Sequence, residues 1–245
     1  MKTNKIKILI MLLFILLGIT IAHAQIKEKS FNLGNNGKIE VNIDYGDIKI
    51  ETRGEGQVTL KYEEDDDADN TSLKIVQNGS TLSITSGDYT SEDIVLFTPS
   101  SINLDLKTDG GDILINGNIT GKVACTTAGG DIRAKDITGN ADMNTAGGEV
   151  VAGKIDGDAT VNSGGGDLNL GTITGKATMN TGGGNIQLYD VNKGLKITTG
   201  GGNVKAGNIG GVFSVTTGGG NVEVKKVSDE FKVTTGGGNI SVETA

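Results

Sequence analysis

The sequence is poor in the residues that carry most catalytic and cross-linking chemistry. Its 245 residues include no Trp and one each of Cys, Pro and His. The single Cys125 excludes an internal disulfide. It also falls in an apolar position of a repeat, which favours a buried small side chain over a reactive thiol. The one histidine, His23, lies in a segment that we expect to be removed, so the remaining chain has no imidazole for catalysis or zinc binding.

The segment 1–24 has the pattern of a secretory signal peptide. Lys2, Lys5 and Lys7 precede an apolar run over positions 8–21, and Ala22-His23-Ala24 follows as a cleavage site. The run is shorter than the about 20 residues that span a bilayer, which argues against an anchored signal helix. No cysteine follows for lipid attachment. We therefore expect an exported protein that begins at Gln25 and works in the periplasm, on the cell surface or outside the cell.

The charge of the mature chain limits its partners. Removing the three lysines of the signal segment leaves 19 basic and 30 acidic residues, a net charge of −11. Such a chain is not expected to bind nucleic acid or to insert into a membrane after cleavage.

The most informative feature is an internal repeat. Thr108-Asp-Gly-Gly-Asp112 recurs as Thr127-Ala-Gly-Gly-Asp131, and later copies such as Thr181 onward read Thr-Gly-Gly-Gly-Asn. The leading Thr or Ser of successive copies stands at positions 108, 127, 145, 163, 181, 199, 217 and 235. After a slightly longer first step, the period is constant at about 18 residues, and a fixed period of this length is the signature of a solenoid.

Apolar residues recur at five fixed positions of each repeat, as the coil 150–161 illustrates with Val150, Ala152, Ile155, Ala159 and Val161. Spacings of two indicate strands with one buried face. We therefore predict an all-β fold, a parallel β-solenoid of about eight 18-residue coils over residues 108–245. The general preference of parallel crossovers favours a right-handed winding. The Gly-Gly pairs are expected to supply positive φ angles at the turns.

Residues 25–107 are β-like but irregular. Gly46-Asp47-Ile48 echoes Gly111-Asp112-Ile113, which predicts one degenerate coil. Hairpins around Asn78-Gly79 and near Pro99 would allow this region to cap the N-terminal end of the rod, where an open sheet edge would otherwise remain.

Three features together resemble a known family. They are the export signal, the opening Val41-x-Ile43…Gly46-Asp47-Ile48, and the Phe97-Thr98-Pro99 entry into the Gly-Gly-Asp repeats. The chain resembles the bacterial "putative adhesin" family of β-solenoid proteins of unknown function, over nearly all of its mature length. The resemblance implies a β-helical fold and an extracytoplasmic site, and it supplies no catalytic residues.

One polar position of the repeat is a candidate site. Stacked carboxylates could bind calcium or act as the acid–base pair of a glycan-cleaving β-helix. Asp and Asn also suit turns, and stacked Asn side chains bond along a rod, which favours a structural role. The column contains Asp112, Asp131, Glu149 and Asp167 as the candidate metal ligands, followed by Asn185, Asn203, Asn221 and Asn239.

Three other interpretations of these sequence features agree less well with the residues. A calcium-binding β-roll needs the glycine motif in both halves of the coil, and here it occurs in one. An ice-binding face needs Thr-x-Thr arrays, whereas adjacent pairs such as Thr198-Thr199 point to opposite sides of a strand. The acidic segment 63–69 is expected to be a solvated loop, with weak cation capture as the alternative.

The sequence thus predicts a non-enzymatic, adhesin-like structural or interaction protein with a repetitive, acidic, Gly/Thr/Asn-rich surface. Its expected partner is an envelope protein or a glycan. A calcium-dependent binding module and a glycan-active enzyme are the alternatives. Ile240 and Val242 are expected to form a terminal strand with an unpaired edge, which would be either a docking site for a partner or a surface for weak end-to-end self-association.

Overall fold

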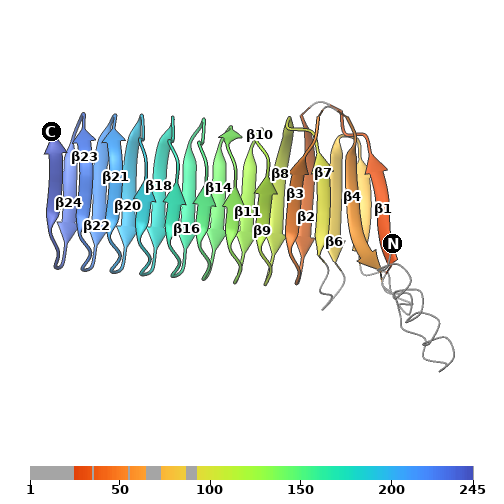
Figure 1. The fold of residues 1–245 in the computed structure, drawn as a ribbon, viewed down its shortest axis with the longest axis horizontal. Coiled ribbons are helices and arrows are strands. Elements are labelled where there is room, and N and C mark those ends of the chain that lie inside the picture. Colours follow the sequence, from red (N-terminus) through yellow and green to blue (C-terminus); the bar gives the residue numbers. More distant parts are fainter. Residues whose placement is uncertain (1–24, 35, 55, 65–72, 87–92, 245) are drawn as a thin grey trace, which may run out of the picture.

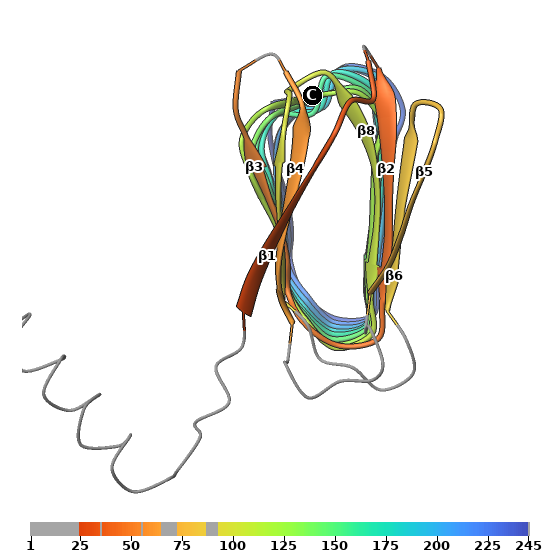
Figure 2. The same ribbon diagram turned by 90° about the vertical axis from the view of Figure 1, so that its right-hand side faces the viewer.

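The computed structural model describes residues 25–34, 36–54, 56–64, 73–86 and 93–244. The predicted signal segment and most of the acidic segment 63–69 lie outside these residues. The described chain forms strands stacked along one axis (Figure 1). Two long sheets make the sides of a rod (Figure 2). The buried apolar side chains form its interior.

We name the two long sheets A and B. In spatial order, sheet A contains β1 (Gln25–Phe31), β4 (Val58–Glu64), β7 (Ile94–Thr98), β3 (Ile48–Thr52), β9 (Ile113–Asn116), β12 (Ile132–Ala134), β15 (Val150–Ala152), β17 (Leu168–Leu170), β19 (Ile186–Leu188), β21 (Val204–Ile209), β23 (Val222–Val227) and β25 (Ile240–Thr244). Sheet B contains β24 (Phe231–Thr235), β22 (Val212–Thr217), β20 (Gly194–Thr199), β18 (Lys176–Thr181), β16 (Ala159–Ser163), β14 (Ala141–Thr145), β11 (Val123–Thr127), β8 (Ile102–Thr108), β2 (Gly37–Ile43), β6 (Thr81–Ser86) and β5 (Leu73–Asn78).

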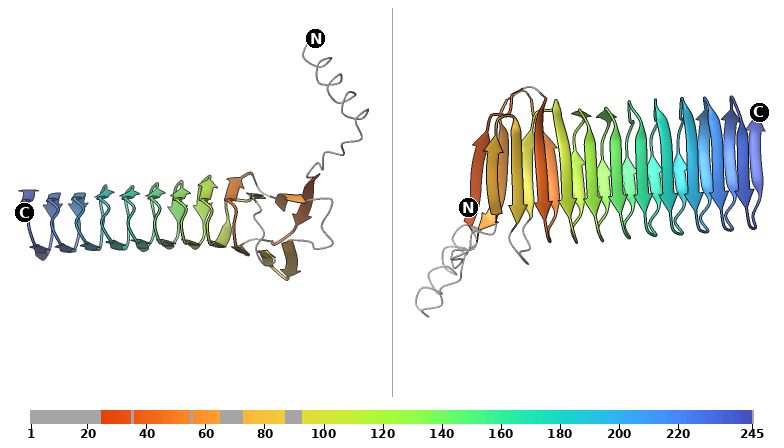
Figure 3. Two further views of the ribbon diagram at one scale, coloured as in Figure 1. Left: turned by 90° about the horizontal axis from the view of Figure 1, so that it is seen from below. Right: turned by 180° about the vertical axis from the view of Figure 1, so that it is seen from behind.

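The register of the strands confirms the predicted parallel solenoid. Ala141 pairs with Ala159 in sheet B and Ile132 pairs with Val150 in sheet A, and each partner is the equivalent residue of the next coil. A short third side of the rod contains β10 (Ile119–Thr120) and β13 (Ile137–Thr138). In later coils this side continues as single β-bridges, the first of them at Ile155. Each coil therefore repeats the one before it (Figure 3).

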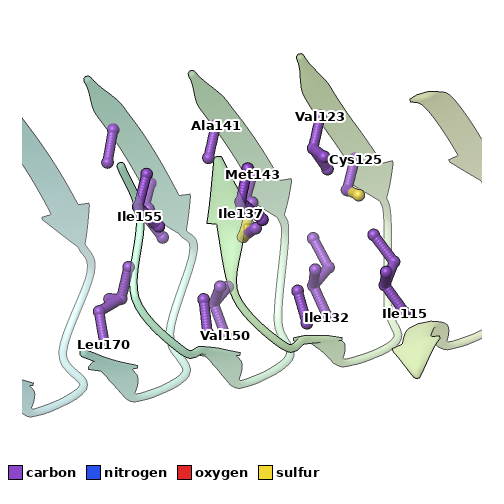
Figure 4. Close-up of a cluster of buried hydrophobic side chains, with 14 of the residues drawn as sticks. Ile115, Val123, Cys125, Ile132, Ile137, Ala141, Met143, Val150, Ile155 and Leu170 are labelled. Atoms are coloured by element: carbon purple, nitrogen blue, oxygen red, sulfur yellow. The ribbon is translucent and has the colours of Figure 1, made fainter. Parts of the chain in front are cut away.

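The five predicted apolar columns line the interior. Ile132, Ile155 and Met143 are fully buried, and Cys125 is buried among them (Figure 4). Phe231 continues one of these columns in register with Phe213, but it is less buried. Its side chain is 39% exposed, whereas Phe213 is 0% exposed, because no further coil of the described chain stacks on β24.

The reason for the turn glycines differs from the prediction. Gly130, Gly148 and Gly166 do not have positive φ angles. Instead, a Cβ atom at each of them would overlap the backbone carbonyl of the equivalent glycine one coil earlier. Glycine is needed here because neighbouring turns stack too closely for a side chain.

The N-terminal region is also a stack of coils, in a different chain order. β2 and β3 pair in parallel with β8 and β9, so residues 37–52 form a coil against the first regular one. The later β6 and β7 pair with the opposite edges of β2 and β3, so this first coil lies between two that follow it in sequence.

Antiparallel strands end the stack on this side. β4 pairs with β7 and β1 with β4 in sheet A, and β5 pairs with β6 in sheet B. The predicted hairpin at Asn78-Gly79 joins β5 and β6, and Gly79 has a φ of 58°. The hairpin near Pro99 was wrong, because β7 and β8 lie in different sheets and Pro99 is in the connection between them. No helix among the described residues is long and apolar enough to cross a membrane.

Candidate interaction surface

The Asp/Asn column forms a hydrogen-bond ladder along the rod. Except at Asp167, the backbone N–H of each residue donates to the side-chain Oδ1 of the equivalent residue one coil earlier, as Glu149 does to Asp131 at 2.7 Å. The same bond is donated by Asp112 to Asp47, by Asp131 to Asp112, by Asn185 to Asp167, by Asn203 to Asn185, by Asn221 to Asn203 and by Asn239 to Asn221, at 2.6–3.0 Å. Asp and Asn both supply this acceptor, which explains why they exchange in the column.

Glu149 interrupts the ladder. Its longer side chain accepts from Arg133 at 2.9 Å and from Asn169 at 2.8 Å. Among the described contacts, no bond joins the Glu149 carboxylate to the backbone N–H of Asp167. Arg133 also donates to Asp131 at 2.8 Å, so one guanidinium bridges two neighbouring carboxylates of the column.

This bridge lowers the pKa of the Asp131 carboxyl. The hydrogen bond from Arg133, together with the N–H of Glu149, holds the pKa of the Asp131 carboxyl below its usual value. The pKa of Arg133 is raised, first through its hydrogen bond to Asp131. Both shifts favour the ionised pair.

The four candidate metal ligands therefore make protein contacts. The described residues include no group of three Asp, Glu, His or Cys side chains with the geometry to hold a metal ion. Asp112, Asp131 and Asp167 each use one oxygen to accept a backbone N–H of the next coil. This arrangement gives the column a structural role, and calcium binding stays a prediction.

The leading Thr of each repeat points inward. Thr181 is 5% exposed, and its hydroxyl donates to the Gly166 carbonyl at 2.9 Å and accepts from the Gly184 N–H at 3.2 Å. The hydroxyl therefore ties one glycine turn to the next. Thr198 is exposed and Thr199 is buried, as predicted for adjacent residues of a strand. Equivalent bonds involve Thr108, Thr127, Thr145, Ser163, Thr199, Thr217 and Thr235.

The outward side of sheet B carries a second polar column, which the sequence reasoning missed. Asn162 donates from Nδ2 to Asn144 Oδ1 at 2.6 Å, and Asn180 donates to Asn162 at 2.7 Å. We call this column the hydroxyl–amide face, and it contains Thr126, Asn144, Asn162, Asn180, Thr198, Thr216 and Thr234. The signal was available in the residue before each leading Thr or Ser, which is always Thr or Asn from residue 126 onward.

Cys125 is the remaining candidate that lies among the described residues. Cys125 is fully buried, and desolvation, with smaller effects of Asp105 and Asp142, raises the pKa of its thiol well above the usual range. This confirms the buried position predicted for it and removes the thiolate needed for reactivity. Most of the acidic segment 63–69 lies outside the described residues.

A stack of parallel coils with polar ladders on its outside defines a β-solenoid protein. The chain belongs to the Toastrack DUF4097 family, whose model matches residues 36–245. This membership, with the solved structures below, confirms the resemblance to the "putative adhesin" proteins. No curated protein matches the chain.

Solved structures share the fold. A "putative adhesin" from Parabacteroides merdae has a TM-score of 0.59 at 15% identity, over 90% of this chain and 98% of that one. A "Putative lipid binding protein" from Parabacteroides distasonis has a TM-score of 0.57 at 13% identity, with the same coverage. A "putative adhesin" from Bacteroides fragilis has a TM-score of 0.53 at 16% identity, over 90% and 98%. At these identities the likeness shows the fold alone.

Proposed function

We propose that this protein is a non-enzymatic, adhesin-like interaction protein that works outside the cytoplasm. The hydroxyl–amide face presents its binding groups to a glycan or protein of the cell envelope. The observation that carries the proposal is the spacing of this face, where one Thr or Asn projects from every coil of sheet B from β11 to β24. Hydroxyl and amide groups both donate and accept hydrogen bonds, so the face suits a polar, extended partner.

The rigidity of the fold supports a role in presenting the hydroxyl–amide face to a partner. The coils are fixed to each other by the carboxamide, carboxylate and hydroxyl ladders as well as by the buried core. Within the face, the Asn side chains are themselves held by bonds along the rod, as from Asn162 to Asn144 and from Asn180 to Asn162, so they lose little further conformational entropy on binding. The names of the similar adhesins agree with such a role.

Paired substitutions on opposite sheets test the face. Asn162→Lys with Asn180→Lys adds two charges to the hydroxyl–amide face, while Asn169→Lys with Gln187→Lys adds two charges to the outward side of sheet A in the same two coils. Residues 25–245 are applied to immobilised glycan and protein fractions of a bacterial envelope. We expect one fraction to bind, and the first variant to bind about tenfold more weakly while the second is unchanged. Binding to neither fraction, or equal losses in both variants, would contradict the proposal.

Export is a separate part of the proposal and rests on residues 1–24. Expression with the native leader, followed by intact-mass measurement of the purified protein, should give a chain that begins at Gln25. A retained Met1 or a lipid adduct would contradict cleavage at Ala24.

A further inference from the structure

Both sheets of the rod have an open edge at the end formed by β24 and β25. These are the outermost strands of sheets B and A in the described chain. In earlier coils the N–H of an inward-facing residue donates to the following coil, as from Phe213 in sheet B at 2.8 Å and from Val222 in sheet A at 2.9 Å. The equivalent N–H groups of Phe231 and Ile240 therefore point along the rod, beyond the last described coil. Such edges allow another strand to add.

The interior of the rod is also open at this end. Ile240 is 45% exposed and Phe231 is 39% exposed, and Val233 and Val242 are only partly buried. The rings of Phe231 and Phe213 lie 5.6 Å apart between centroids, so the core is apolar up to its last layer. Covering this layer would remove apolar surface from water, which is favourable.

The distribution of charge permits a second copy of the chain to approach this end. Residues 225–245 contain three lysines and three acidic residues, whereas residues 25–107 contain 16 acidic and 8 basic residues. Two copies that meet at their neutral ends keep their acidic regions at the far ends of both rods, well beyond the screening length of about 10 Å at 0.1 M salt. The acidic end is less suited to this contact, because antiparallel strands β1, β4 and β5 close it.

The two edge strands are complementary to each other. β24 and β25 each contain five residues, and the chain reverses direction at the turn between them, so the two sheets run in opposite directions (Figure 2). A two-fold axis parallel to the strands would therefore place β25 of one copy antiparallel to β24 of the other. Val242 can then lie opposite Val233 on the inner side. In that register the exposed Glu243 lies opposite the exposed Lys232 on the outer side.

We propose that two copies of this chain join end to end, with β25 of each copy paired antiparallel with β24 of the other. The symmetry forms the Lys232–Glu243 contact twice, and opposite charges facing each other across an antiparallel pair stabilise it. The joint also pairs the open N–H groups and covers Phe231 and Ile240. Both edges of each copy are used, so the assembly stops at a dimer. This inference goes beyond the proposed function and does not rest on it.

Charge reversal tests the pairing of the two strands. In analytical ultracentrifugation at low salt, residues 25–245 should form a dimer at roughly 100 μM, a concentration suited to a small interface. Lys232→Glu should weaken the dimer about tenfold, because like charges then face each other twice. Adding Glu243→Lys to Lys232→Glu should restore the dimer. The matched control, Lys196→Glu, makes the same change in the same column two coils earlier and should leave the dimer unchanged.

A further variant tests the backbone pairing independently of charge. Val242→Pro removes an N–H that points to the open end, whereas Ser241 and Glu243, as the alternate residues, direct theirs toward β23. This variant should abolish the dimer, and melting curves show whether each variant is folded.

Five outcomes would overturn the proposal. They are a wild type that stays monomeric, an unchanged dimer in Lys232→Glu, a double charge reversal that does not restore the dimer, equal losses in Lys196→Glu and Lys232→Glu, and a dimer that survives Val242→Pro. Assemblies larger than a dimer would indicate head-to-tail joining and would also overturn it. None of these results depends on Asn162 or Asn180, so the failure of the dimer and the failure of the hydroxyl–amide face are distinguishable.

Discussion

The side chain of Asn203 accepts the backbone N–H of Asn221, in the next coil, at 2.9 Å. Its own amide donates back to Asn185 at 3.2 Å. Each Asp and Asn of the column from Asp112 to Asn221 thus satisfies a backbone N–H of the next coil, which would carry a cost if it were unpaired. The Asp and Asn residues that the sequence offered as candidate metal ligands therefore join one turn of the rod to the next.

Removing one member of this ladder should destabilise the rod. Asn203→Ala leaves the N–H of Asn221 without its acceptor and should lower the free energy of unfolding by about 1 kcal/mol. Asn192→Ala is the control, since Asn192 is exposed and lies outside the ladder. Asn203→Asp should cost less than Asn203→Ala because it keeps Oδ1. Urea denaturation measures all three, and equal losses for the two Ala variants would contradict the ladder.

Calcium should have little effect on stability. Asp131→Asn with Asp167→Asn keeps both Oδ1 acceptors and loses the charge-assisted contact of Asp131 with Arg133, which is exposed and contributes little. We expect nearly the same melting temperature for this variant and the wild type, in calcium and in chelator. A wild-type melting temperature that rises by roughly ten degrees in calcium, with no rise in the variant, would restore the metal site.

The Asp131–Arg133 contact predicts that the stability of the protein depends on pH in the acid range. The pKa of Asp131 is lowered in the folded protein, first by its hydrogen bond with Arg133. Its contribution to stability is therefore fully present above the pKa of the unfolded chain, about 4, and is lost as pH falls through the lower folded value. The difference in unfolding free energy between the wild type and Asp131→Asn should shrink between pH 6 and pH 3. If this difference grows as the pH falls from 6 to 3, the predicted direction of the pH dependence is wrong.

Much of the fold could be predicted because the same pattern of apolar residues and glycines recurs in every coil of the repeat. The alternation around Val150 and Ala152 gives the buried side, and the constant period gives the register. The turn glycines were misassigned because their constraint comes from the carbonyl of another coil, which local φ preferences do not reveal. Cζ of Arg53, which follows β3, lies 3.6 Å from the ring centroid of Phe97 in β7, and no period of the repeat predicted this contact because both residues lie in the irregular N-terminal region.

The last prediction uses two adjacent residues of β20. Thr199 is 2% exposed, and its hydroxyl donates to the Gly184 carbonyl at 3.3 Å and accepts from the Gly202 N–H at 3.1 Å. Thr199→Val keeps the shape but leaves both backbone groups unpaired, which should cost about 1–3 kcal/mol. Thr198→Val changes an exposed position and should cost under about 0.5 kcal/mol. Thr199→Ser should retain most of the stability, since Ser163 makes the same bonds in its own coil. Equal losses in Thr198→Val and Thr199→Val, measured by urea denaturation, would show that the buried hydroxyls do not hold the turns together.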